Sequence, residues 1–291
     1  MKKLNGTDIL GIFTILLLTM ITITGLLSFN IENSYWITNQ YGDPVNLFGS
    51  GIYARDSYFK APIFIGSDFT MLFLVVPMMT TALLKEIKHR TLKSKLQLTA
   101  FAATVLYYAT SIAFGITYNA FHLIYIALFG CSLFLVITLM IKNDAPALQK
   151  ALKWKLPTRG IRIFLILSGI SLLIAWLPDI IPTIFSGKPL PLIEVYTTEI
   201  TYVLDMGIIS PLMFICLGLL QKQNGLGIVL LSILLTLCVI IGAMLPIQTV
   251  FQTLAGIVLP LPVLIAKVGI FVVLAAFAAY YNSKLYKSIK E

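Results

Sequence analysis

Residues 226–247 read LGIVLLSILLTLCVIIGAMLPI, a run of 22 positions without a charged side chain. A helix needs about 20 mainly apolar residues to cross the hydrocarbon core of a bilayer. Seven further windows qualify, at roughly 9–29, 69–84, 96–117, 120–141, 163–185, 200–220 and 263–281. The sequence therefore predicts an all-α integral membrane protein with about eight transmembrane helices.

The composition of the 291-residue chain agrees with this class. Hydrophobic residues make up 58% of the chain, charged residues only 11%, and the mean hydropathy is +0.94. Soluble domains carry about 25% charged residues. These values exclude a cytosolic enzyme, a secreted disulfide scaffold and a disordered chain. The three cysteines lie inside apolar runs and are interpreted as packing residues.

The basic residues predict which side of the membrane each loop faces, because Lys and Arg gather in cytoplasmic loops. With the N-terminus inside, 17 of the 21 basic residues fall in inside segments, among them Lys2, Lys3 and those of loop 142–162. The exceptions are Arg55, Lys60 and Lys188 outside, and Lys267 within the last span. The pattern predicts that both termini are cytoplasmic. It also explains the net charge of +9 as a topology signal that faces anionic lipid, not as a nucleic-acid surface.

Two loops have compositions typical of the membrane interface. The external loop from Asn30 to Gly66 is rich in Tyr, Trp and Phe, so we expect it to fold onto the outer surface. The inside loop 142–162 places apolar residues among lysines and predicts a short interfacial helix. Those apolar residues are Leu148, Leu152, Trp154 and Leu156.

The second and sixth spans carry matching marks. Asp68 lies 17 residues before Lys85 and Asp205 lies 17 residues before Lys222, with Pro77 or Pro211 in between. In each half a tight external hairpin is expected after the next span, at Tyr118-Asn119 and at 248–252. The match predicts two parallel four-helix repeats, 1–141 and 163–291, joined by the inside loop 142–162. Chance is the rival explanation, because acids and prolines are not rare at membrane helices and because the proline offsets differ.

Several ionisable residues lie at similar depth in the predicted helices. At 1.5 Å per residue, Asp68 and Asp205 are about 25 Å from the inner boundary, and Lys267 lies at about the same depth. Charges at such depth usually face the interior of a bundle. We expect Lys267 to be the countercharge of Asp205 or Asp68. The candidate substrate or ion site comprises Asp68, Asp205, Lys267, Glu199, Tyr202, Tyr118, Asn119, His122 and Asp56.

Other interpretations of these residues stay open. A structural salt bridge or hydrogen-bond cluster explains buried charges equally well, and some of the residues could simply sit in the interface. With two histidines, a three-histidine metal site is impossible. Gly49-Ser50-Gly51 lies in a loop without a histidine base, and no phosphate-binding glycine loop occurs. No metal, cofactor or catalytic residue is predicted.

Three short stretches resemble marks of a group of uncharacterised bacterial multi-pass membrane proteins that have no assigned activity. They are Gly51-Ile52-Tyr53-Ala54-Arg55-Asp56, Tyr118-Asn119 and Tyr202-Val203-Leu204-Asp205. The resemblance implies about eight helices in a bacterial plasma membrane and carries no catalytic assignment.

Three functions remain as hypotheses. The first is a transporter or permease for a small solute or ion, with an outward-facing polar site. The second is a non-catalytic membrane partner, such as a sensor, an immunity factor or an assembly subunit, which would bind another protein or a second copy. The third is an outer-leaflet enzyme that uses first-loop carboxylates such as Asp56. All three place the chain in the lipid bilayer.

Overall fold

The computed structural model describes residues 4–153 and 155–290, and among these residues eight helical spans are long and apolar enough to cross a membrane. Three of the spans consist of two α-helices joined by a π-helical turn (η2, η3 or η4). The spans are α1 (Gly6–Leu27), α2–η2–α3 (Ala61–Thr70, Met71–Val75, Val76–His89), α4 (Leu92–Gly115), α5 (His122–Lys142), α7 (Arg159–Ser186), α8–η3–α9 (Ile200–Leu204, Asp205–Ile209, Ser210–Gln221), α10 (Gly225–Leu254) and α11–η4–α12 (Leu261–Leu264, Ile265–Gly269, Ile270–Ser288). The prediction of an all-α multi-pass membrane protein is confirmed.

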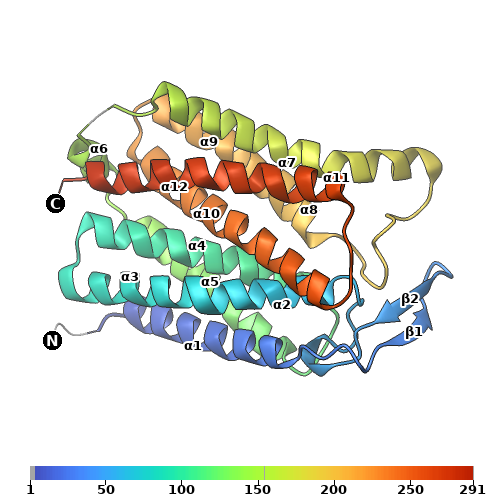
Figure 1. The fold of residues 1–291 in the computed structure, drawn as a ribbon. Coiled ribbons are helices and arrows are strands. Elements are labelled where there is room, and N and C mark those ends of the chain that lie inside the picture. The colour runs from blue at the N-terminus through green and yellow to red at the C-terminus, as the bar shows by residue number, and fades with distance from the viewer. Residues whose placement is uncertain (1–3, 154, 291) are drawn as a thin grey trace.

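Both chain ends lie at the same end of the bundle, and the β1–β2 hairpin lies at the other (Figure 1). We call these the terminal end and the hairpin end. Lys2 and Lys3, which contributed to the predicted orientation, lie outside the described residues.

The second span begins earlier than the hydropathy window that starts at residue 69. The helix already starts at Ala61, with Pro62 in its first turn, where the missing N–H of proline removes no hydrogen bond. Asp68 is therefore inside the helix, and the external loop ends at Lys60 instead of Gly66.

The predicted hairpin at 248–252 is wrong. These residues belong to α10, which continues to Leu254, and the chain turns only after it. The amides of Gln248 and Gln252 are satisfied inside the bundle, because they donate to Ser67 Oγ at 2.7 Å and to the Phe59 carbonyl at 3.2 Å. These amides therefore need no solvent, and α10 continues past them.

The first loop forms a cap over the hairpin end. It contains β1 (Tyr35–Thr38), β2 (Pro44–Leu47) and the 3-10 turn η1 (Gly51–Tyr53), with the two strands paired antiparallel. Phe48 and Tyr53 are buried in it, whereas Trp36 is exposed. The cap is joined to segment 187–199 of the second half. Asn39 Nδ2 donates to the Glu194 carbonyl, and Gln40 Nε2 donates to the Tyr196 carbonyl.

The inside loop 142–162 contains a short helix, α6 (Ala145–Ala151). Leu148 and Leu156 are buried in the core of the second half, and α6 packs against α10. The predicted short helix is therefore present, and these two leucines pack into the protein core; the interfacial position of the helix stays a prediction. Trp154, part of that prediction, lies outside the described residues.

The two spans that carry the matching prolines Pro77 and Pro211 share a backbone irregularity. In both, a π-helical turn ends two residues before the proline: η2 before Pro77 and η3 before Pro211. Proline has no N–H to donate to the preceding turn, and a π-turn rearranges the backbone bonds around that gap. These two turns therefore lie directly before a proline. The third, η4, has no proline at that offset, and the described parts of α7 and α10 contain prolines without a π-helical turn.

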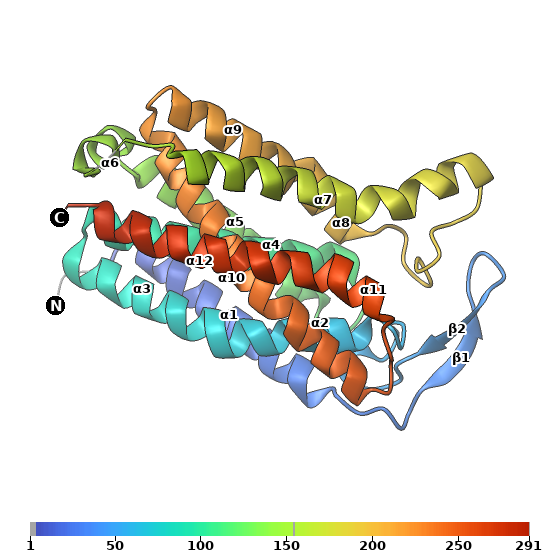
Figure 2. The ribbon, with the colours of Figure 1, turned by 45° about the horizontal axis from the view of Figure 1, so that its top comes forward.

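The two sets of four spans each have their own core. One buried cluster lies mainly among α1–α5 and another mainly among α7–α12. The sets meet through α10, which packs against α2 and α4, and through α4, which packs against α8. Figure 2 shows α10 crossing between the two sets.

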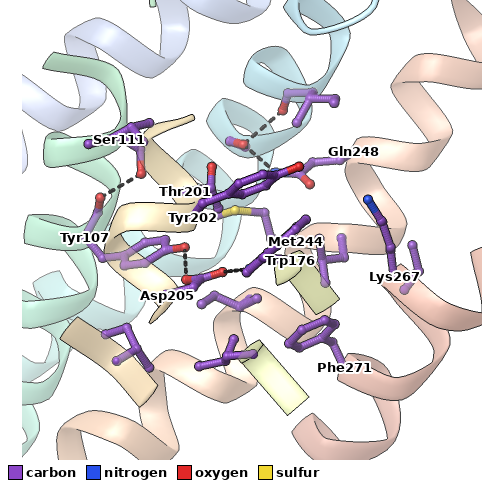
Figure 3. A pocket seen from close by; sticks show the side chains of 18 of the residues that line it. Tyr107, Ser111, Trp176, Thr201, Tyr202, Asp205, Met244, Gln248, Lys267 and Phe271 are labelled. Atoms are coloured by element: carbon purple, nitrogen blue, oxygen red, sulfur yellow. Dashed lines mark hydrogen bonds between the residues drawn. The ribbon is translucent and has the colours of Figure 1, made fainter. Parts of the chain in front are cut away.

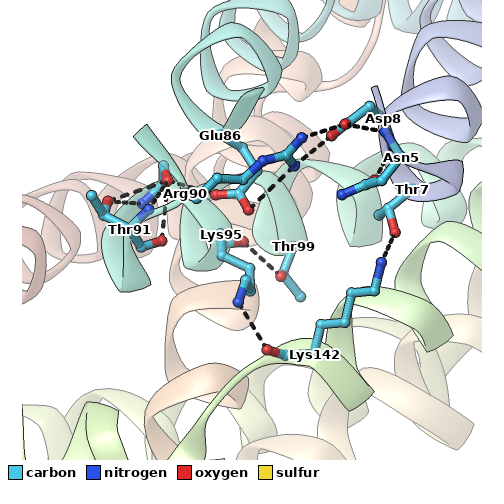
Figure 4. Close-up of polar contacts among 10 residues, drawn as sticks. Asn5, Thr7, Asp8, Glu86, Arg90, Thr91, Lys95, Thr99 and Lys142 are labelled. Carbon is cyan, nitrogen blue, oxygen red and sulfur yellow. Dashed lines mark hydrogen bonds and ion pairs between the residues drawn. The ribbon is translucent and has the colours of Figure 1, made fainter. Parts of the chain in front are cut away.

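A polar network closes the terminal end of the first set (Figure 4). Arg90 donates both guanidinium branches to the carboxylate of Asp8 on α1, at 2.7 and 2.5 Å, and approaches Glu86 at 3.8 Å. Lys142 of α5 donates to Thr7 Oγ1. Bidentate Arg–carboxylate pairs are geometrically specific, so this network fixes α1 against the α3–α4 turn.

Candidate binding cavity between the two halves

A cavity of about 320 Å³ lies between the two sets of spans. Its wall includes residues of α2 and α4 from the first set and of α7, α8, η3, α10, η4 and α12 from the second. Figure 3 shows the side chains that converge on it. It begins at the hairpin end, beside Lys60, Glu199 and Gln252, and reaches Ser168 and Leu237, close to the middle of α7 and α10. The cavity therefore extends into the depth that the membrane core would occupy.

Asp205 is the acidic group deepest in the cavity wall. It begins the π-helical turn η3 and is 5% exposed. Its Oδ1 accepts from the Tyr107 hydroxyl at 2.8 Å, and its Oδ2 accepts from Trp176 Nε1 at 2.9 Å. Within the described part of the chain, no lysine or arginine forms an ion pair with it. The Asp205 carboxylate thus accepts hydrogen bonds from two aromatic side chains and has no countercharge among the described residues.

Lys267 also lines the cavity, but its partner differs from the prediction. Its Nζ contacts Asp179 Oδ2 of α7 at 2.6 Å, and neither Asp205 nor Asp68 is its countercharge. The same Asp179 oxygen accepts from the Tyr202 hydroxyl at 2.7 Å. The Tyr202 ring stacks on Trp176, with centroids 4.6 Å apart. Asp179 therefore organises Lys267 and Tyr202 along one side of the cavity.

A second ion pair lies in the cavity wall at the hairpin end, which we call the mouth. Lys60, the last residue of the first loop, pairs with Glu199, which precedes α8 in the second set. The Lys60 ammonium also lies 4.2 Å from the centroid of the Tyr196 ring. The pair connects the two halves at the hairpin end of the cavity.

Asp68 does not line the cavity. It is 0% exposed inside the first set, where its oxygens accept from the hydroxyls of Tyr53, at 2.7 Å, and Tyr108. Gly25 of α1 lies against it so closely that an added Cβ would stand 1.7 Å from Asp68 Oδ2. This geometry makes Asp68 a link between α2, α4 and η1.

Asp56 is likewise outside the cavity, buried in the cap at 0% exposure. Its Oδ1 accepts from the Thr117 N–H at 2.9 Å and from the Tyr196 hydroxyl at 3.0 Å. Burial raises the pKa of the Asp56 carboxyl to about 7, against the opposing effect of these two hydrogen bonds.

The remaining predicted residues lie in the turn between α4 and α5, where the expected hairpin does occur. Asn119 donates to the Ile52 carbonyl at 2.9 Å and so holds the cap. Tyr118 is 69% exposed, and its ring lies beside His122, with centroids 5.4 Å apart. None of these three residues lines the cavity. Of the nine predicted residues, Asp205, Lys267, Glu199 and Tyr202 line it.

Three residues that organise the site were not among those predicted: Tyr107, Trp176 and Asp179. Asp179 carried a usable signal, because it is an acid within an apolar run in the same way as Asp205. Tyr107 and Trp176 carried none, since an aromatic residue in a membrane helix is ordinary.

Comparison with known proteins gives no match. No protein-family model, no curated protein and no solved structure matches it. Among the described residues, no three His, Cys, Asp or Glu side chains gather as a metal site would require. Function must therefore be argued from the cavity itself.

Proposed function

We propose that this protein is a transporter or permease that binds a small solute in the cavity between its two halves. The observation that carries the proposal is the position of the cavity, which is bounded by both sets of spans. Its wall contains the carboxylate of Asp205, which forms no ion pair with any described residue. Ionisable residues at membrane depth commonly mark substrate pathways, and transporters commonly bind substrates between halves near the membrane midplane.

The two ends of the bundle support a direction of entry. The mouth lies at the hairpin end, where the first loop and segment 187–199 meet at the Lys60–Glu199 pair. The terminal end is packed by α6, Leu148 and Leu156 and by the Arg90–Asp8 network. A solute would enter at the hairpin end, and relative movement of the halves about α4 and α10 would expose it at the other.

The basic residues support the orientation of this proposal. With the terminal end in the cytoplasm, the cavity opens toward the outside of a plasma membrane. The resemblance to uncharacterised bacterial multi-pass proteins supports a bacterial plasma membrane as the location. The two predicted four-helix repeats, 1–141 and 163–291, would be the two moving halves.

The other two hypotheses receive less support. The enzyme hypothesis needs a first-loop carboxylate at a lipid-accessible cleft, but Asp56 is buried in the cap, and Glu32 and Asp43 do not line the cavity. A purely structural partner subunit would be expected to be packed through its centre, where this chain has a cavity of about 320 Å³.

A substitution that fills the cavity with a larger side chain tests the proposal. Ser171 of α7 lines the cavity, whereas Ile174 on the same helix is 63% exposed and does not. The purified protein would be screened against neutral, anionic and cationic solutes by thermal unfolding. A ligand at 100 times its Kd adds about 2.7 kcal/mol to the free energy of unfolding. We expect a stabilising solute to lose its effect on Ser171→Phe and to keep it on Ile174→Phe.

The solute found in this way would then be used in counterflow with proteoliposomes. Uptake by the wild type and by Ile174→Phe, but not by Ser171→Phe, is expected. Equal stabilisation of both phenylalanine variants, or binding without any counterflow, would contradict a transport function for this cavity.

A further inference from the structure

We infer that the cavity selects a small organic cation, an amine or quaternary ammonium group on an apolar body. This inference rests on the proposed function and deepens it by naming the class of solute. It comes from the charge balance of the wall, from the aromatic rings around Asp205 and from a buried hydroxyl that has no partner.

The charged groups of the cavity leave one negative charge. Lys60 is paired with Glu199, and Lys267 is paired with Asp179. Asp205 is the acidic lining residue that remains, and among the described residues only neutral donors contact its oxygens. A monovalent cation would neutralise Asp205, while an anion would add a second negative charge in a space of low dielectric.

The rings that surround Asp205 suit a cation. Tyr107, Trp176, Tyr202 and Phe271 lie around it in Figure 3. An aromatic face attracts ammonium groups, most strongly when water is excluded. Trp176 already shows this behaviour within the protein, because the Lys267 ammonium lies 5.3 Å from its ring centroid.

The rest of the wall suits an apolar body with few polar groups. Met71, Met213, Met244 and Leu172 contribute flexible or branched apolar side chains, and the volume of about 320 Å³ is at the small end of ligand pockets. Ser168 Oγ is buried and, among the described residues, has no hydrogen-bond partner. It offers one polar contact near the bottom of the cavity.

Three small aromatic probes separate the effect of charge from the effect of fit. Benzyltrimethylammonium is the cation, neopentylbenzene is its neutral carbon isostere, and benzenesulfonate is an anion of similar size. Binding to the protein in nanodiscs of zwitterionic lipid would be measured by equilibrium dialysis, with Ser171→Phe as the background for partition into lipid. We expect wild-type protein to bind the cation at least about tenfold more tightly than the isostere, and to bind no anion.

Variants of Asp205 and Asp68 test which carboxylate gives the preference for the cation. Asp205→Asn should reduce the preference for the cation over the isostere to about one, and Asp205→Glu should retain most of it. Asp68→Asn removes an equally buried acid that does not line the cavity, and its preference should equal that of wild type. Thermal unfolding of each variant without a probe checks that it is folded.

The outcomes separate the two claims. Equal binding of cation and isostere, or an unchanged preference in Asp205→Asn, overturns the cation class while the cavity remains a binding site. Binding of the anion in place of the cation does the same. If no probe binds better to wild type than to Ser171→Phe, the cation inference is overturned. The solute screen then decides separately whether the cavity binds anything.

Discussion

Asp68 and Asp205 each accept two hydrogen bonds from aromatic side chains, and each has a tyrosine of α4 as one donor. Their donors Tyr108 and Tyr107 are neighbours in sequence, so one helix anchors a carboxylate in each half. Only Asp205 lies at a cavity, and only it is expected to bind a solute. The sequence identifies both acids by depth, but it does not distinguish them, because the difference arises from which neighbours fill the space beside each.

The contact between Gly25 and Asp68 predicts a large effect of one methyl group. Gly25→Ala would place a Cβ 1.7 Å from Asp68 Oδ2 and 3.3 Å from the Tyr53 hydroxyl, so the carboxylate must move. Overpacking of this kind costs about 1–3 kcal/mol. We expect a lower unfolding temperature in detergent. Gly130→Ala is the matched control, because no atom lies within 4 Å of the added Cβ apart from the adjacent residues and the backbone of its own helix. Equal unfolding temperatures would contradict the account of Asp68.

The buried carboxyl of Asp56 predicts a pH dependence of stability. Its pKa is raised in the fold from 3.8 to about 7, so the folded protein binds the proton more tightly than the unfolded chain. The resulting stabilisation is complete below about pH 4 and is lost as the pH rises through 7. Between pH 5 and 8 the loss is about 2–3 kcal/mol. Asp56→Asn should lack this pH dependence, because an amide does not titrate in this range. Its oxygen can still accept the hydrogen bonds of Thr117 and Tyr196.

The difference between wild type and Asp56→Asn isolates this group, because all other titrating residues are shared. Unfolding temperatures at pH 5, 6, 7 and 8 would measure it. Glu194, whose pKa burial also raises, is tested separately with Glu194→Gln. A constant difference between wild type and Asp56→Asn across this range would show that Asp56 does not titrate in the folded cap.

At the scale of elements, apolar runs and prolines predicted more than the polar residues did. The runs located all eight spans, and Pro77 and Pro211 follow two of the three π-helical turns among the described residues. Gln248 and Gln252 led to the wrong prediction of a hairpin, because glutamines near the end of an apolar run are typical of a loop. Their hydrogen-bond partners, Ser67 and Phe59, are distant in sequence and could not be recognised from it. The β1–β2 hairpin was also missed, since its pairing involves only four residues in each strand.

The ion pair of Lys60 and Glu199 is one of the links between the halves, and it predicts rescue by charge exchange. Lys60→Glu and Glu199→Lys should each lower the free energy of unfolding, because each places two like charges together. The double variant should recover much of the loss, with an interaction energy of about 1–3 kcal/mol. Recovery is incomplete because the Tyr196 ring beneath Lys60 would then face a carboxylate.

A double-mutant cycle of unfolding temperatures or denaturant midpoints measures this interaction. Additive effects of the two single substitutions would mean that the pair does not hold the halves together at the mouth.

At the scale of the molecule, the predicted duplication stays a prediction, and the packing of the spans favours it. A twofold axis along the bundle would exchange α4 with α10, and the contact of α10 with α2 has its counterpart in the contact of α4 with α8. In each set, successive spans pack together and the first span contacts the fourth. The position of the cavity could not be predicted from sequence, because it depends on how the two sets meet.

The orientation is tested by labelling cysteines at the two ends. In a variant with Cys131, Cys216 and Cys238 changed to alanine, Gln40→Cys in the cap and Gln149→Cys in α6 would be exposed to a membrane-impermeant thiol reagent on intact cells. Labelling of the cap position alone is expected from the distribution of basic residues. Labelling of the α6 position alone would reverse the proposed direction of entry.

The central claim is that water and solutes reach the cavity between the halves from the hairpin end. The most direct measurement is the rate at which a small cationic methanethiosulfonate, added on that side, modifies Ser171→Cys in the cysteine-free background. Ile174→Cys, exposed on the same helix outside the cavity, is the control. We predict that Ser171→Cys is modified and that Ile174→Cys, facing lipid, is not. An unreactive Ser171→Cys, or equal rates at both positions, would contradict a cavity open to solutes.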